Sequence, residues 1–281
     1  TQAKTLFPYT TLFRSHEDTL KAIEDTDAMA FTGSTHTGRL LAAHAGKHLK
    51  KTVLELGGSN PFIILPDADL QRAAIDACYS RFRDAGQSCN AAKRIVVTQD
   101  IAEQFIPLFL AECARLQTGN PKDPNTTLAP LHRQDLRQTV HEQVQDAVAH
   151  GAQCLSGGYI PDGESWFYPA TVLDQVNPNC RVWHEEVFGP VAMILRADNP
   201  DHAVALANDT PFGLGACIYT ADTENAWQYA ERIQAGSVFI NRHTSSDLRL
   251  PFGGVKASGY GRELSEFGLY EFVNVKTYWQ K

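Results

Sequence analysis

Short apolar runs alternate along this chain with longer segments of helical periodicity, and each run ends at glycine or at polar residues. The runs Ala28–Thr32, Thr52–Leu56 and Arg94–Thr98 are predicted to be strands. The segments that follow them are predicted to be helices and cover Ser34–Leu49, Ala68–Phe82 and Ile101–Leu116. Strands that alternate with helices are typical of an α/β fold with a mostly parallel sheet.

The first fifteen residues do not fit this pattern. The stretch Thr5–Ser15, TLFPYTTLFRS, equals an in-frame translation of a common sequencing-library adapter. Two origins are open: adapter sequence joined to a partial gene, or a natural segment that coincides with it. We set residues 1–15 aside as a non-native segment and expect natural sequence to begin near His16.

Composition excludes several function classes. The formal net charge is −7 and there is no basic stripe, so we expect no nucleic-acid partner. Apolar runs are far shorter than the roughly 20 residues that span a bilayer, so we expect no membrane partner. Six cysteines in 281 residues, with no CxxC pair, favour reduced thiols and a cytoplasmic location. All except Cys89 are expected to be buried, small apolar side chains, namely Cys78, Cys113, Cys154, Cys180 and Cys217.

Metal ligation is not predicted. His44 and His48 lie four residues apart on a predicted helix, but HAGKH lacks the glutamate of HExxH. A solvated helix face is the expected role of both histidines.

Short glycine-containing motifs are the candidate sites. Phe31-Thr32-Gly33-Ser34 places a helix start after a strand, which suits a phosphate group. Glu55 precedes Gly57-Gly58, and Cys89 follows a turn at Gly86, where a thiolate can be exposed. The later segments EEVFGP and PFGG are further Gly/Pro turns. Each motif alone is also compatible with an ordinary turn.

Taken together and in order, FTGS, LELGG, GQSC, EEVFGP and PFGG resemble the aldehyde dehydrogenase superfamily, with closer similarity to its succinate-semialdehyde group. The similarity extends from His16 to Lys281. It implies a catalytic α/β domain at 57–257, a truncated Rossmann-type cofactor domain at 16–56, and a C-terminal return segment at 258–281. The alternating tail Glu271–Trp279 is expected to be an oligomerisation strand.

The resemblance also implies residue roles. Cys89 matches the nucleophile, whose thiolate attacks the aldehyde and whose backbone N–H helps to hold the oxyanion. Glu55 matches the general base for thioester hydrolysis. The cofactor contacts that match are Gly33, Ser34, Leu56, Glu186 and Phe188.

Recognition of a substrate carboxylate calls for arginine and hydroxyl partners. Arg83 lies six residues before Cys89, where relatives can carry a carboxylate-binding arginine. Ser245, Ser246 and Arg249 precede Phe252, in a loop that lines the substrate entrance in the family. For Arg83 a surface charge at a helix end is an equally acceptable role, and for Arg249 a surface charge is the simpler one.

The activity that this resemblance implies is oxidation of an aldehyde, expected to be succinate semialdehyde, with NAD or NADP through a thiohemiacetal and a thioester. The intact parent is expected to form a homodimer or homotetramer. The family's N-terminal half, which supplies an oxyanion-binding asparagine and a lysine for the adenosine ribose, has no counterpart here. Two alternatives therefore stay open: an inactive truncated fragment, or a weak cofactor-independent esterase.

Overall fold

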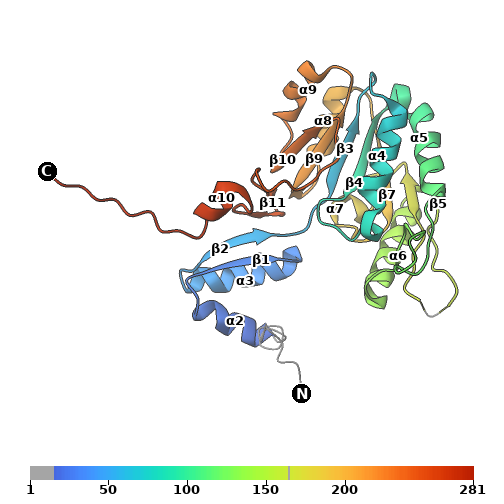
Figure 1. Cartoon of the computed structure of the whole chain (residues 1–281). Coiled ribbons are helices and arrows are strands. Elements are labelled where there is room, and N and C mark those ends of the chain that lie inside the picture. Colours follow the sequence, from blue (N-terminus) through green and yellow to red (C-terminus); the bar gives the residue numbers. More distant parts are fainter. Residues whose placement is uncertain (1–15, 164) are drawn as a thin grey trace.

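The computed structural model describes residues 16–163 and 165–281, so the segment interpreted as adapter-derived lies outside the described residues. Its largest element is a seven-stranded sheet in the order β10-β9-β3-β4-β7-β6-β5 (Figure 1). The strands are β3 Asn60–Ile64, β4 Ala92–Thr98, β5 Gln153–Ser156, β6 Thr171–Asp174, β7 Val191–Ala197, β9 Gly215–Tyr219 and β10 Ser237–Ile240. Every neighbouring pair is parallel except β5 and β6, which confirms the predicted α/β class.

Helices cover this sheet and share one apolar core with it. They are α4 Leu70–Phe82, α5 Gln99–Ala114, α6 Gln134–Ala149, α7 Arg181–His184, α8 Pro200–Asn208 and α9 Thr223–Ala230. The chain steps from β3 to β4 through α4, and in the opposite direction from β7 to β9 through α8. Right-handed crossovers that run in opposite directions place their helices on opposite faces. The sheet is therefore buried on both sides, and all seven residues of β4 are buried.

A smaller sheet lies beside the large one. Strands β1 Ala28–Thr32 and β2 Lys51–Glu55 are parallel, and β12 Gly259–Tyr260 pairs antiparallel with β2. Helices α2 His16–Glu24 and α3 Thr35–Lys47 pack there around a separate apolar cluster. The described elements are completed by a short strand pair, a 3-10 helix and a last helix, namely β8 Phe212–Gly213 with β11 Val255–Lys256, η1 Arg83–Gly86 and α10 Ser265–Tyr270. The proposed domain boundaries stay a prediction.

Local sequence explains where the helices begin. The Ser34 hydroxyl accepts a hydrogen bond from the Thr37 amide, at 3.2 Å, and caps α3 as predicted. Asp69 caps α4 in the same way through the Arg72 amide, at 3.1 Å. Pro107 lies inside α5, which nevertheless continues as one helix from Gln99 to Ala114.

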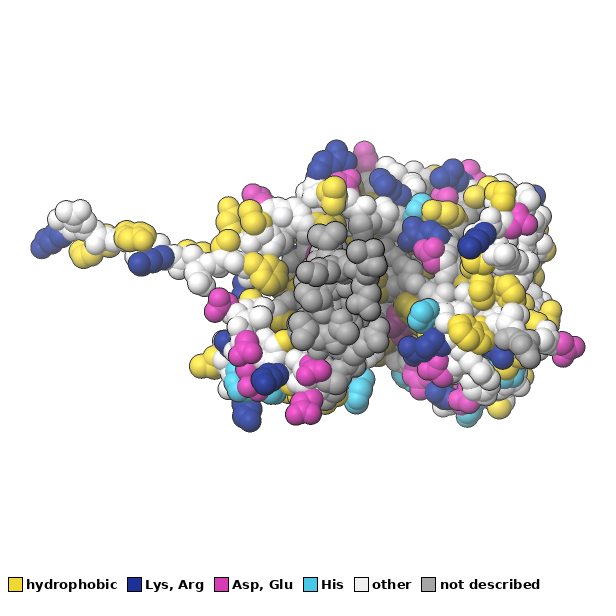
Figure 2. Space-filling model, turned by 60° about the horizontal axis from the view of Figure 1, so that its bottom comes forward, with side chains coloured by type: hydrophobic (Ala, Val, Ile, Leu, Met, Phe, Trp, Pro, Cys, Tyr) yellow, Lys and Arg dark blue, Asp and Glu magenta, His cyan; other side chains and the backbone are white. Residues whose placement is uncertain are grey.

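The C-terminal tail differs from the expectation. Residues 271–281 contain no strand in this chain, and they extend away from the body (Figures 1 and 2). Val275, Tyr278 and Trp279 are more than 80% exposed. An extended segment needs the hydrogen-bonding edge of a sheet to become a strand, and the tail lies along none of the described strands. Its pairing with another subunit stays a prediction.

Two further expectations concerned the burial of the cysteines and the presence of membrane-spanning helices. Cys154 is exposed, contrary to the expectation that it is buried, because it lies on β5 at the margin of the large sheet. The other four cysteines expected to be buried are buried. In the described part of the chain, no helix combines the length and apolar character needed to cross a membrane.

Candidate active site

The loop that carries Cys89 begins with an unusual turn. Helix α4 ends at Phe82, and Asp84, Ala85 and Gly86 all adopt positive φ before the chain reaches Cys89. A β-carbon at Gly86 would collide with the carbonyl of Gly189. Gly86 therefore lets this loop lie directly against the segment that contains Glu186.

Cys89 is half-buried at the end of this turn and faces groups of both charges. Burial raises the pKa of its thiol, the Lys93 ammonium opposes that rise, and the carboxylates of Glu186 and Glu55 add to it. A hydrogen bond from the backbone of Asn90 also lowers the pKa. The predicted nucleophile and the predicted base are thus close enough for their charges to interact.

Glu55 is the last residue of β2, and its side chain is buried. Neither carboxylate oxygen has a hydrogen-bond partner among the described residues. The pKa of Glu55 is raised to about 8: burial is the largest cause, the charge of Glu263 adds to it, and Arg262 opposes both effects. A buried, unpartnered carboxyl group with a pKa near neutrality has the properties of a general base.

Gly57 and Gly58 allow two other site elements to approach β2. A β-carbon at Gly57 would collide with Oε2 of Glu186, and one at Gly58 would lie 2.6 Å from the carbonyl oxygen of Cys89. The amide of Gly58 donates a hydrogen bond of 3.1 Å to Oε1 of Glu186. The two glycines of LELGG therefore hold the base, the nucleophile loop and Glu186 together.

Of the predicted cofactor residues, Gly33, Ser34 and Leu56 directly follow strands of the small sheet, and Glu186 and Phe188 lie between α7 and β7. Gly33 and Ser34 are exposed at the start of α3, where helical N–H groups lack partners from within the helix. Leu56 lines a hollow of about 260 Å³ together with Thr35, Arg39 and Tyr260. Gly58 and Lys93 both donate to Oε1 of Glu186, which leaves Oε2 without a partner among the described residues. This donor and acceptor set fits a dinucleotide: amides for phosphate and a carboxylate for ribose hydroxyls.

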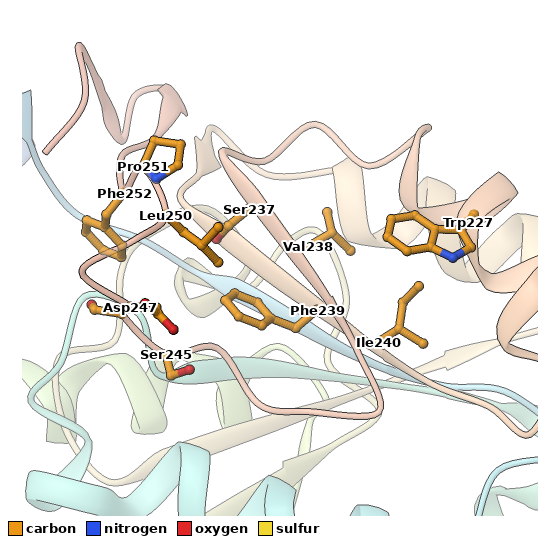
Figure 3. Close-up of a pocket in the computed structure, with 11 residues that line it drawn as sticks. Trp227, Ser237, Val238, Phe239, Ile240, Ser245, Asp247, Leu250, Pro251 and Phe252 are labelled. Atoms are coloured by element: carbon orange, nitrogen blue, oxygen red, sulfur yellow. The ribbon is translucent and has the colours of Figure 1, made fainter. Parts of the chain in front are cut away.

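Three of the five predicted substrate residues, Ser245 among them, line a pocket of about 440 Å³ beside β10 (Figure 3). Ser246 and Phe252 are among its lining residues. Phe252 also bridges to Glu263 through backbone hydrogen bonds of 2.8 and 2.7 Å. A β-carbon at the next residue, Gly253, would lie 2.8 Å from Oε1 of Glu55. The pocket wall therefore continues to the predicted base.

The two arginines predicted to bind a substrate carboxylate, Arg83 and Arg249, do not line this pocket. Arg249 is 86% exposed and forms an ion pair of 2.7 Å with Asp247. Arg83 lines another hollow, of about 500 Å³, with Tyr79 and Phe82, and its Nε lies 3.4 Å from Asp84. The structure thus does not bring the two arginines together with Ser246 and Phe252 in one pocket. Carboxylate binding by either arginine stays a prediction.

The pair His44 and His48 has a third neighbour that sequence spacing did not reveal. Glu24, on α2, lies 3.1 Å from Nε2 of His44 and 3.6 Å from Nε2 of His48. The three possible ligand atoms lie within 4.8 Å of one another. All three side chains are at least partly exposed, as expected for a solvated helix face.

Sequence reasoning missed several residues that hold the nucleophile loop. Asn60 accepts from the amide of Gly215 and donates to the carbonyl of Asn90, at 3.1 Å each, while Thr244 donates to the same carbonyl at 2.6 Å. Lys93 is fully buried beneath Cys89. Its signal was the pair of charged residues, Lys93 and Arg94, that precedes the apolar residues of the run AKRIVVT.

Comparison with known proteins identifies the family. The aldehyde dehydrogenase family model matches residues 12–278. A succinate semialdehyde dehydrogenase [NAD(P)+] of Escherichia coli is 49% identical over 253 residues, which are 90% of this chain and 55% of that protein. An aldehyde dehydrogenase of Paenarthrobacter nicotinovorans is 45% identical over 96% of this chain and 60% of its own length.

Solved structures agree. A succinic semialdehyde dehydrogenase of Streptococcus pyogenes in complex with NADP+ superposes with a TM-score of 0.91 and 39% identity, over 93% of this chain and 58% of that one. The chain therefore spans a little more than half the length of the relatives it matches. With the family match covering almost the whole sequence, this chain belongs to the aldehyde dehydrogenase family.

Proposed function

We propose that this chain carries the acyl-transfer centre of an NAD(P)-dependent aldehyde dehydrogenase that acts on succinate semialdehyde. The observation that supports it most directly is the meeting of Cys89, Glu55 and Glu186 at Gly57-Gly58. The names of the Escherichia coli and Streptococcus pyogenes relatives support the substrate and the cofactor. The proposed substrate is a small aldehyde. The proposed protein partner is a second copy of the same protein.

The chain's own residues have defined tasks in this proposal. The thiolate of Cys89 attacks the aldehyde carbon and forms a thiohemiacetal. A nicotinamide, when bound, would accept the hydride from the thiohemiacetal carbon, which leaves the acyl group on Cys89 as a thioester. Glu55, once deprotonated, takes a proton from water, and the resulting hydroxide attacks the thioester carbonyl and releases the acid from Cys89. Gly33, Ser34, Leu56, Glu186 and Phe188 are the residues proposed to hold the dinucleotide.

The second candidate function is cofactor-independent ester hydrolysis. It is favoured by the fact that the nucleophile and the base both lie within the described residues, and acyl transfer through them needs no hydride acceptor. The whole chain is tested with succinate semialdehyde plus NAD+ or NADP+, and separately with p-nitrophenyl acetate. Cofactor reduction supports the dehydrogenase, and p-nitrophenol release alone supports the esterase. A folded chain with neither activity is the inactive fragment.

The raised pKa of Glu55 predicts a pH dependence of both rate and stability. Ester hydrolysis by the original chain is expected to show a rise centred near pH 8, where Glu55 ionises, in addition to the rise that comes from ionisation of the Cys89 thiol. Glu55→Gln is expected to lose the rise near pH 8 and about 10²–10³ in rate.

Because the folded-state pKa of Glu55 lies above the ordinary value of 4.5, the folded state keeps a proton that the unfolded state has lost. Stability contributed by Glu55 is therefore full below about pH 4.5 and falls between there and about 8.

The measurement is the melting temperature of the original chain and of Glu55→Gln at pH 6 and pH 8.5, together with the pH–rate profile of each. The Tm of the original chain is expected to fall more between these two values than that of Glu55→Gln. Parallel Tm changes in the two proteins, or an equal rise of the rate near pH 8 in both, would contradict the assignment.

Self-association through the tail is also testable. The exposed side chains of Val275, Tyr278 and Trp279 are expected to be covered in an oligomer, because apolar groups exposed in a row favour association. A chain that ends at Glu271 is expected to sediment at a lower average mass than the whole chain. Equal sedimentation of the two proteins would refute the tail as an interface.

A further inference from the structure

Lys93 is the second residue of β4 and its side chain has no exposed surface. Its ammonium donates to the carbonyl oxygens of Ser88 at 2.7 Å and Cys89 at 2.9 Å, and to Oε1 of Glu186 at 3.0 Å. An ammonium group has three N–H donors, so each donor has one acceptor. A buried charge is costly unless it is paired and fully hydrogen-bonded, and this one is both.

Resting on the proposed function, we propose that Lys93 is a positioning residue that joins the nucleophile loop to Glu186 and supplies the positive charge that lets Cys89 ionise between two carboxyl groups. No assigned role in the mechanism above requires a lysine at this position. Its three acceptors belong to two segments of the site: the nucleophile loop, through the carbonyls of Ser88 and Cys89, and the segment that carries the proposed ribose-binding carboxylate of Glu186.

The charges that face Cys89 show why a cation is needed. Burial and the carboxylates of Glu186 and Glu55 all disfavour the thiolate, and Lys93 is the cation that acts against them. Glu55 has its own pKa raised to about 8, so Glu186 is the main negative neighbour at neutral pH. Because Lys93 binds Glu186 directly, it reduces the effect of that carboxylate on the thiol as well.

A second buried cation holds the same loop without touching Glu186. Nη2 of Arg81 donates to the carbonyl oxygens of Gly86 at 3.2 Å and Val187 at 3.3 Å, and also to that of Gly189. Arg81 therefore fastens the turn before Cys89 to the segment after Glu186. Since Arg81 already provides this fastening, the specific contribution of Lys93 is its charge beside Cys89 and its bond to Glu186.

Strand β4 offers a matched control. Arg94, the next residue, is equally buried, but its guanidinium donates to the carbonyl oxygens of Trp183 at 3.2 Å and Leu206 at 2.7 Å. It is not among the groups that act on the Cys89 thiol. Replacing Arg94 by Met removes a buried cation from the same strand and leaves the site charges in place.

The experiment measures the rate of alkylation of Cys89 by iodoacetamide from pH 5.5 to 10, peptide by peptide, in the whole chain. Lys93→Met is expected to raise the midpoint of the rate profile by at least one pH unit, so that alkylation near pH 7 slows about tenfold. Arg94→Met is expected to leave the midpoint of Cys89 unchanged. The exposed thiol of Cys154 reports reagent reactivity in the same samples and should not respond to either substitution.

An unchanged Cys89 midpoint in folded Lys93→Met would overturn the proposal. Alkylation of the buried Cys217 would show that Lys93→Met does not fold. In that case Glu186→Gln tests the same charge balance, because it removes the negative charge that Lys93 opposes. That variant is expected to lower the midpoint, and no change there would refute the proposed charge balance. Alkylation needs neither aldehyde nor cofactor, so this result is independent of whether the proposed dehydrogenase or esterase activity is found.

Discussion

Cys89→Ala is expected to abolish the acyl chemistry of this chain. With p-nitrophenyl acetate, the original protein should gain an acetyl group on the peptide that contains Cys89 and should release p-nitrophenol. Removing a covalent nucleophile costs on the order of 10⁴–10⁶ in rate, because the remaining groups act only on bound substrate and water. The measurement combines p-nitrophenol absorbance with mass spectrometry of the acetylated peptides.

Cys154→Ala is the matched control for this substitution. Cys154 is the exposed thiol among the described cysteines, so it is the most accessible site for non-specific acetylation. Cys154→Ala is expected to leave the rate of p-nitrophenol release unchanged. Acetylation that persists at the same rate in Cys89→Ala, on another side chain, would remove the basis for a cysteine mechanism.

Gly58→Ala is expected to have the second largest effect, although it adds only a methyl group. That β-carbon would lie 2.6 Å from the carbonyl oxygen of Cys89, which is backbone and cannot rotate away. The nucleophile loop must therefore shift relative to Glu55. Displacement of reacting groups by about 1 Å can cost about 10² in rate, so we expect ester hydrolysis to fall by about that factor.

Gly46→Ala separates this effect from a general cost of replacing glycine. Gly46 lies in α3, and a β-carbon there would meet no atom within 4 Å. The substitution should keep the original rate and stabilise the fold by about 0.5–1 kcal/mol, since alanine favours helix. Full activity in Gly58→Ala, or an equal loss in Gly46→Ala, would show that close contact at Gly58 does not position the nucleophile.

Elements with a clear local signal were predicted well from the sequence. The strand Ala28–Thr32 has the predicted bounds, and α3 begins at the predicted cap Ser34. These boundaries depend on neighbours a few residues away, namely a glycine that ends a strand and a hydroxyl that caps a helix. The resemblance of the five ordered motifs to the aldehyde dehydrogenases was confirmed for the same reason, because each motif is local.

Features that depend on distant partners were not predicted. Lys93 lies near Cys89 in sequence, but its meaning comes from Glu186, which is 93 residues away. Glu24 completes a cluster with His44 and His48 from a different helix. The tail Glu271–Trp279 has an alternating pattern that local reasoning assigns to a strand, yet a strand exists only where another strand offers its edge.

The connection between the two sheets has a mechanical consequence. Glu55 ends β2 of the small sheet, and five residues later β3 of the large sheet begins (Figure 1). Cys89 lies in the turn just before β4 of the large sheet. The base and the nucleophile are thus carried by different sheets, which the chain connects between β2 and β3 and again between β10 and β12. A rotation of the small sheet against the large one would change the distance between the Glu55 carboxylate and the acyl carbon on Cys89. The proposed hydrolysis therefore depends on the alignment of the two sheets.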